Sequence, residues 1–159
     1  MKSIEIKGDN YVGSYQRIRL ACRAIVVKDD MILLSYEKNT NQFMIPGGGL
    51  EIGESEECCV KREVEEETGF LLDVDECVLE IHEYYGDERY ISKYFLGRIV
   101  GDGAIHLTAR EIEVGMEPRW IKREEALRIF SSHESFRDID EMRRGLYLRE
   151  YTALKAILK

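Results

Sequence analysis

The 159-residue sequence lacks an apolar run long enough to cross a membrane, and its N-terminus lacks the apolar stretch of a secretion signal. It has only two prolines, Pro46 and Pro118, and it has no repeat or low-complexity segment that would mark a linker. We therefore expect one continuous domain over residues 1–159, soluble and cytoplasmic, with no membrane partner.

Positive charge is also scarce, because 23 lysines and arginines face 31 acidic residues and leave a net charge of −8. Proteins that coat duplex nucleic acid need an excess of basic residues to displace phosphate counterions, so we expect no duplex partner. Hydrophobic residues make up 44% of the chain, which is enough to bury a core and excludes a disordered acidic tail.

Zinc-like cysteine spacing is missing as well. Four cysteines are present, and none forms a C-x-x-C pair: Cys22, Cys58, Cys59 and Cys77. We interpret them as small buried apolar residues in a reducing compartment.

Apolar periodicity predicts a mixture of strands and helices without regular βαβ alternation. Strands are expected over residues 18–27, 31–36, 71–84, 90–100, 105–107 and 118–121, the first two forming a hairpin. Helices are expected over residues 55–68 and 123–130, and an amphipathic helical tail over about 136–158 that breaks at Gly145. This pattern indicates an α+β fold with helices against a mixed sheet.

The segment over residues 55–68 carries the chemistry. Glu63, Glu66 and Glu67 have the spacing i, i+3 and i+4, which places three carboxylates on one helical face. Such a cluster is unfavourable unless a cation joins it, and oxygen ligands suit magnesium, or manganese as a substitute, better than zinc. Magnesium is commonly completed by substrate phosphates, so the cluster points toward phosphate chemistry.

A glycine-rich turn, Gly47 to Gly49, precedes this helix and lets the backbone approach other groups closely. Together they read G-x5-E-x7-R-E-(apolar)-x-E-E-x-G-(apolar), whose positions are Gly48, Glu54, Arg62, Glu63, Val64, Glu66, Glu67, Gly69 and Phe70. Over residues 48–70 the chain resembles the Nudix hydrolase superfamily of MutT type, with no departure from its signature.

The resemblance implies an α/β/α sandwich around a mixed sheet, and magnesium-dependent hydrolysis of a nucleoside diphosphate linked to a moiety X. Glu63, Glu66 and Glu67 would hold the metal together with the backbone of Gly48. Glu54 would support the catalytic site, and Arg62 would hold the loop carboxylates. The general base differs among family members, and we favour Glu63. A further ligand or base from a later loop would be Glu113 or Glu117, and both residues are equally well explained as surface glutamates.

The substrate is less well defined by the residues. No proline lies between Leu71 and Glu117, which disfavours ADP-ribose, so a nucleoside triphosphate or dinucleoside polyphosphate is the expected substrate class. Phe43 or Tyr85 would stack on a base, and Arg89 would meet a phosphate; packing or surface charge explains these residues equally well. Tyr90 and Arg23 are further candidates of the same kinds.

Two other functions stay open. One is a non-catalytic member that senses a nucleotide or sugar, although an intact signature argues against it. The other is a pyrophosphohydrolase acting on the 5′ end of RNA, which the net charge of −8 mildly disfavours. The apolar C-terminal stretch leaves a homodimer open.

Overall fold

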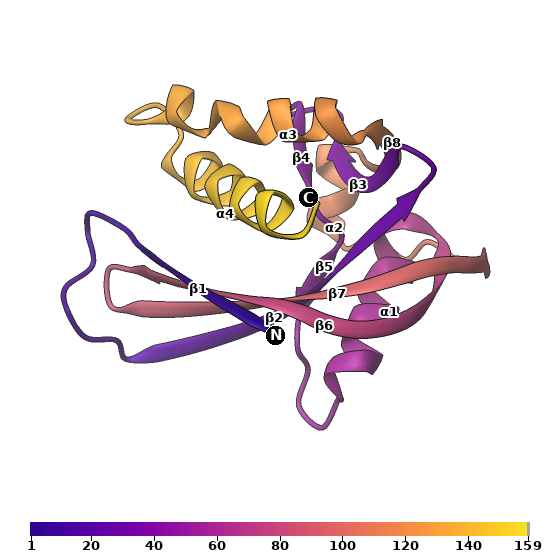
Figure 1. The fold of residues 1–159 in the computed structure, drawn as a ribbon, viewed down its shortest axis with the longest axis horizontal. Helices are drawn as coiled ribbons and strands as arrows, with labels where there is room; N and C mark the ends of the chain where they lie inside the picture. The colour runs from indigo at the N-terminus through magenta and orange to yellow at the C-terminus, as the bar shows by residue number, and fades with distance from the viewer. Residues whose placement is uncertain (159) are drawn as a thin grey trace.

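A mixed β-sheet organises the chain in the computed structural model, which describes residues 1–158 (Figure 1). The strand order is β1-β6-β7-β2-β3-β4, while β5 pairs with β2 and β8 pairs with β3. The strands are β1 (Lys2–Lys7), β2 (Arg17–Lys28), β3 (Met31–Glu37), β4 (Gln42–Met44), β5 (Gly47–Gly49), β6 (Phe70–Tyr85), β7 (Glu88–Asp102) and β8 (Met116–Lys122).

The sheet divides into two branches at the β2–β3 hairpin. Only two residue pairs join these strands, Val27 with Ile32 and Lys28 with Met31. Beyond this point β2 pairs with β7 and β5, whereas β3 pairs with β4 and β8. The divergence leaves space between the branches for side chains that reach across.

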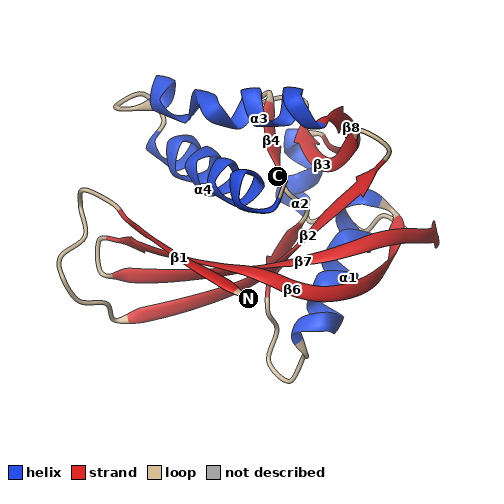
Figure 2. Cartoon of the chain, viewed as in Figure 1, coloured by secondary structure: helices blue, strands red, loops and turns tan. Residues whose placement is uncertain are grey.

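Helices cover both faces of the main branch (Figure 2). Helix α1 (Glu56–Thr68) lies on one face of this branch, which comprises β1, β6, β7, β2 and β5, and α4 (Glu141–Ile157) lies on the other, while α3 (Arg123–Ser131) packs on α4 and on β3 and β8 of the second branch. The short helices are α2 (Ala109–Val114) and the 3-10 helix η1 (Ser132–Phe136). This arrangement confirms the expected sandwich, and the described residues contain no helix long and apolar enough to span a membrane.

Alternate residues of β2 face two separate cores. Cys22, Ala24 and Val26 pack with Val60 and Val64 of α1. Ile25, on the opposite face, joins Leu79, Ile81 and Tyr94 of β6 and β7 and packs with Ala153 and Leu154 of α4. The alternation follows from the period of two in a strand and fixes which β2 side chains lie beneath α4.

The ends of α1 are set by local chemistry, as the sequence predicts. Ser55 accepts a hydrogen bond from the Cys58 amide at 3.1 Å, and Gly69 ends the helix with a φ of 76°. Helix α4 continues through Gly145, so the predicted break is wrong. The glycine instead makes room for Tyr85, whose hydroxyl would lie 3.3 Å from a Cβ at that position.

The strand predicted over residues 105–107 is also wrong. This segment crosses the end of α1, where the amides of Gly103 and His106 donate to the carbonyls of Gly69 and Glu66, and it leads into α2 instead. Strand β1 was missed. Among the cysteines, Cys22 and Cys59 are buried and Cys77 is half-buried, but Cys58 is exposed, so its predicted burial is wrong.

Candidate active site

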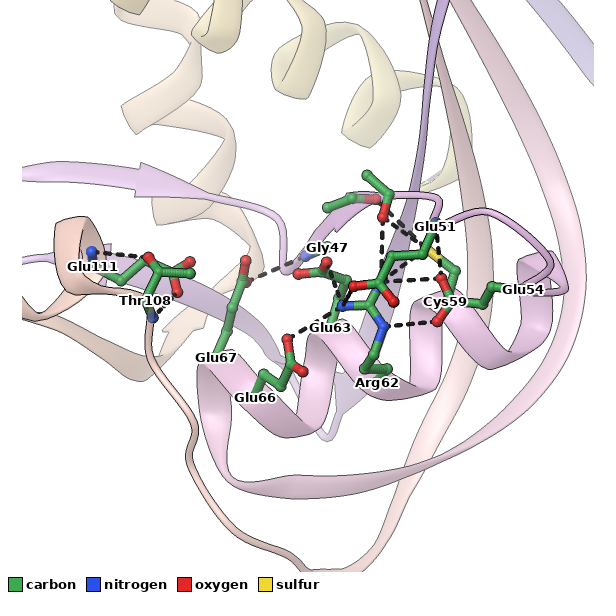
Figure 3. A network of polar contacts seen from close by, with 12 residues as sticks. Gly47, Glu51, Glu54, Cys59, Arg62, Glu63, Glu66, Glu67, Thr108 and Glu111 are labelled. Atoms are coloured by element: carbon green, nitrogen blue, oxygen red, sulfur yellow. Dashed lines mark hydrogen bonds and ion pairs between the residues drawn. The ribbon is translucent and has the colours of Figure 1, made fainter.

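Arg62 of α1 lies at the centre of a cluster of carboxylates (Figure 3). Its Nε and Nη2 atoms donate to the two carboxylate oxygens of Glu54, at 2.7 and 3.0 Å. This bidentate pair holds the loop before α1 against the helix. The guanidinium lowers the pKa of Glu54 to about 2, so Glu54 is ionised at neutral pH.

The same guanidinium reaches two predicted metal ligands. Arg62 Nη1 donates to Glu63 Oε1 at 2.8 Å and to Glu66 Oε2 at 3.2 Å, and Nη2 donates to the Gly49 carbonyl at 3.2 Å. A positive charge therefore already sits between Glu63 and Glu66.

Glu67 lies deeper than the other two helix glutamates. Its side chain crosses the space between the two branches of the sheet, where Ser35 Oγ of β3 donates to Oε2 at 2.9 Å and the Gly47 amide of β5 donates at 3.3 Å. Burial raises the pKa of Glu67 to about 8, more than these two hydrogen bonds lower it. The carboxylate has no cationic partner among the described residues.

Glu63 packs against the glycine-rich turn. A Cβ at Gly48 would lie 2.4 Å from the carboxyl carbon of Glu63, so a larger residue here would displace the Glu63 carboxylate. Burial raises the pKa of Glu63, although its bond to Arg62 opposes the shift. The Gly48 carbonyl, the predicted backbone ligand, accepts from the Cys59 thiol at 3.6 Å.

The side chains of the two later glutamates predicted from the sequence form no hydrogen bond or ion pair with the cluster within residues 1–158. Glu117 pairs with Arg119 at 2.8 Å and with Lys38 at 3.6 Å, and Glu113 is exposed on α2. The acidic residue of this segment that raises the pKa of both Glu63 and Glu67 is Glu111. Figure 3 shows it across from Glu67.

Glu111 is a site candidate that the sequence reasoning missed, although a signal was present. It forms a capping box with Thr108, in which the Glu111 amide donates to Thr108 Oγ1 at 3.2 Å and Glu111 Oε1 accepts from the Thr108 amide at 2.9 Å. The spacing T-x-x-E is typical of a helix start and would have predicted α2.

The three predicted substrate contacts are dispersed. The Phe43 ring lies 4.4 Å from that of Tyr36, and its amide donates to the Tyr147 hydroxyl. Tyr85 lines a cavity beside α4. Arg89 faces the other side of the sheet, where its Nη1 donates to the Tyr15 hydroxyl at 3.1 Å.

The donor set suits a hard divalent cation, since Glu63, Glu66 and Glu67 offer only oxygen ligands. In the described part of the chain, however, no three acidic, histidine or cysteine side chains converge closely enough to hold a metal as they stand. Arg62 occupies the space between two of the glutamates.

Comparison with known proteins identifies the family of this chain. Residues 17–139 match the family model of the NUDIX domain, a span that contains the whole glycine turn, α1 and α2. The chain belongs to the Nudix family. It is a hydrolase that acts on pyrophosphate bonds, and Nudix hydrolases generally use divalent metals.

Two kinds of relative support this assignment. Diphosphoinositol polyphosphate phosphohydrolase 3-alpha of Mus musculus is 23% identical over 122 residues, which are 77% of this chain and 73% of the relative. A NUDIX hydrolase from Nitrosomonas europaea superposes with a TM-score of 0.61 at 22% identity, covering 85% and 88% of the two chains. MutT NUDIX hydrolase from Burkholderia pseudomallei gives 0.55 at 23% identity, covering 69% and 86%. At this identity the two solved structures establish the fold.

Proposed function

We propose that this Nudix protein is a magnesium-dependent pyrophosphohydrolase that cleaves a nucleoside diphosphate linked to another moiety X. The observation that carries the proposal is the triad Glu63, Glu66 and Glu67, in which Glu67 is a buried carboxylate without a cationic partner among residues 1–158. Burying an unpaired carboxylate is unfavourable, so the arrangement favours a bound cation. When bound, a divalent cation neutralises phosphate charge and makes water more acidic.

The chain's own residues supply the proton transfer. A water oxygen bonds to phosphorus, the bridging oxygen leaves with its electron pair, and a carboxylate takes the proton of the water. We assign this step to Glu63 Oε2, because Oε1 accepts from Arg62 in the metal-free protein. Arg62 and Glu54 keep the helix and its preceding loop in register during the reaction.

As the substrate, we favour a nucleoside triphosphate or a dinucleoside polyphosphate over ADP-ribose. The names of the mouse relatives indicate a different substrate, a diphosphoinositol polyphosphate, for those proteins. Both substrate types contain the same phosphoanhydride bond, so the triad would serve either of them. Substrate choice must therefore come from residues outside the triad.

The test is phosphate and pyrophosphate release from nucleoside triphosphates, diadenosine polyphosphates, nucleotide sugars, a diphosphoinositol polyphosphate and triphosphorylated RNA. Each substrate is assayed with magnesium, with manganese and with EDTA. We expect release only with a divalent cation, and a loss of roughly 100-fold or more in kcat for Glu67→Gln, the scale of losing a key catalytic group.

Glu57→Gln is the matched control, since Glu57 lies on the same helix and, within residues 1–158, pairs only with Lys61 at the surface. It should keep wild-type activity. Activity that persists in EDTA would contradict the metal dependence. Magnesium-dependent nucleotide binding without hydrolysis of any substrate would instead indicate a non-catalytic protein that senses a nucleotide or sugar.

A further inference from the structure

A cavity of about 640 Å³ lies between the N-terminal half of α4 and the ends of β2, β6 and β7 that are remote from α1. Cavities of this size commonly hold small-molecule ligands. Figure 1 shows α4 lying over this end of the sheet. Nothing in the catalytic triad accounts for the cavity.

The cavity lies on the face of β2 that leads to the glycine turn. Arg19 lines it, and Arg23, four residues further along the strand, faces the same side. Arg23 is the register partner of Gly47, and its Cγ would lie 2.7 Å from a Cβ there. The Gly47 amide in turn donates to Glu67. Four residues of strand span about 13 Å, so Arg19 lies about that far along β2 from Arg23 and the glycine turn.

Two tyrosines form the apolar part of the wall. The Tyr85 and Tyr90 rings lie 6.5 Å apart, at 56° to each other. Tyr85 is held on both sides, since a Cβ at Gly8 would lie 2.3 Å from its ring and one at Gly145 would lie 3.3 Å from its hydroxyl. The Tyr90 hydroxyl donates to Glu88. The fixed rings offer a platform for a planar group.

The charged part of the wall is balanced. The cavity is lined by four arginines, Arg19, Arg137, Arg144 and Arg149. It is also lined by four carboxylates, Asp9, Glu83, Asp138 and Glu141. A densely phosphorylated ligand needs an excess of positive charge, which this wall does not provide. A nucleobase carries both hydrogen-bond donors and acceptors on a planar ring, and it suits such a wall.

The arginines differ in how free they are. Arg137 pairs with Glu134, Arg144 pairs with Glu141 at 2.7 Å, and Arg149 donates to Glu150 at 3.0 Å. Arg19 is exposed and forms no ion pair within residues 1–158. It is therefore the cation of the wall that is available to a ligand.

We propose that this cavity binds the nucleobase of the substrate, with Tyr90 stacking on the base and Arg19 contacting a carbonyl or phosphate oxygen. The proposal rests on the proposed function, because it places the diphosphate at the triad. It assigns substrate choice to the far ends of β2 and β7 and selects a nucleotide over a phosphorylated polyol.

Binding can be tested without turnover, by calorimetry with adenosine and guanosine α,β-methylene diphosphates in magnesium. We expect Tyr90→Ala to weaken binding by roughly tenfold or more, the scale of losing one base–aromatic stack. Arg19→Gln should weaken it by a smaller factor. Tyr15→Ala is the matched control, because Tyr15 lies on the opposite face of the sheet beside Arg89, and it should bind as wild type.

Kinetics separate this proposal from the catalytic one. With a nucleoside triphosphate, Tyr90→Ala should raise KM with little change in kcat, whereas inorganic tripolyphosphate, which has no base, should be hydrolysed equally by both proteins. Equal losses on both substrates, or unchanged nucleotide binding, would overturn the proposal. So would inositol hexakisphosphate binding more tightly than either nucleotide and being weakened by Tyr90→Ala. An inactive wild-type enzyme that still binds nucleotide through Tyr90 would overturn only the hydrolase.

Discussion

Two buried glutamates, Glu67 and Glu150, lie on opposite faces of the sheet, and their pKa values are shifted in opposite directions. Glu67 is 4% exposed and Glu150 is fully buried, so burial alone would raise the pKa of both residues. Burial does raise the pKa of Glu67 to about 8, since its hydrogen-bond donors are the neutral groups of Ser35 and Gly47.

Burial also opposes ionisation of Glu150, but Arg149 and Arg23 more than offset it and hold its pKa below the usual range. Its oxygens also accept from the Ile45 amide at 2.5 Å and from the Tyr94 hydroxyl at 2.8 Å. The fold thus supplies a counter-ion to the glutamate that joins α4 to the sheet. Glu67, the glutamate that faces the site, has no counter-ion among residues 1–158.

The largest expected effect comes from removing the paired glutamate. Glu150→Ala removes the nearer of the two carboxylates that pair with the buried Arg149 and leaves only Glu83, at 3.7 Å, so it should lower the free energy of unfolding by about 3–5 kcal/mol. Urea denaturation measures this loss. The triple variant Glu83→Gln/Arg149→Met/Glu150→Leu removes all three charges and should recover most of the stability, whereas a triple variant as unstable as Glu150→Ala would refute a charge-based explanation.

The unpaired glutamate should make the metal-free protein less stable as the pH rises. Between the ordinary glutamate pKa and about 8, Glu67 is ionised in the unfolded chain but protonated in the folded one, so the unfolded state binds fewer protons. Stability is therefore highest below this window and is lost as the pH rises through it.

Urea denaturation in EDTA from pH 5 to pH 9 tests this expectation, with Glu67→Gln as the reference. The variant should gain up to about 4 kcal/mol in unfolding free energy relative to wild type across this range. A difference that does not vary with pH would show that Glu67 is already ionised in the folded protein.

The smallest effect concerns the neutral donor to Glu67. Ser35→Ala should cost about 1.5–3 kcal/mol at pH 9, where the hydrogen bond is to an ionised group, and about 1 kcal/mol at pH 5. Ser92→Ala is the control, since Ser92 is a buried serine that accepts from Arg23 at 3.4 Å. Its cost should not vary between these pH values, and a matching pH dependence in both variants would contradict the role given to Ser35.

Local signals made α1 predictable in detail. Ser55, Gly69 and the apolar pair Val60 and Val64 determine its ends and its buried face within fifteen residues of sequence. The strands β2, β3, β6, β7 and β8 were also predicted within a few residues of their bounds. The resemblance to the Nudix family then predicted the α/β/α sandwich for the rest of the chain.

Features that depend on distant segments were not predictable. Strand β1 has only Ile4 and Ile6 to bury, and it is stabilised by parallel pairing with β6, some 77 residues later in the chain. Gly145 would interrupt an isolated helix, yet Tyr85 packs against it. The environments of Glu67 and Glu150 depend on Ser35 and Arg23, which the sequence does not place near them.

Arg62 also determines whether helix α1 depends on a bound metal ion in order to fold. The Arg62 guanidinium lies between Glu63 and Glu66 and also reaches Glu54. Its positive charge therefore offsets the repulsion among these three carboxylates. The acidic helix can therefore form before any metal ion binds. Removal of a bound cation would therefore leave these ion pairs, and the helix that carries them, in place.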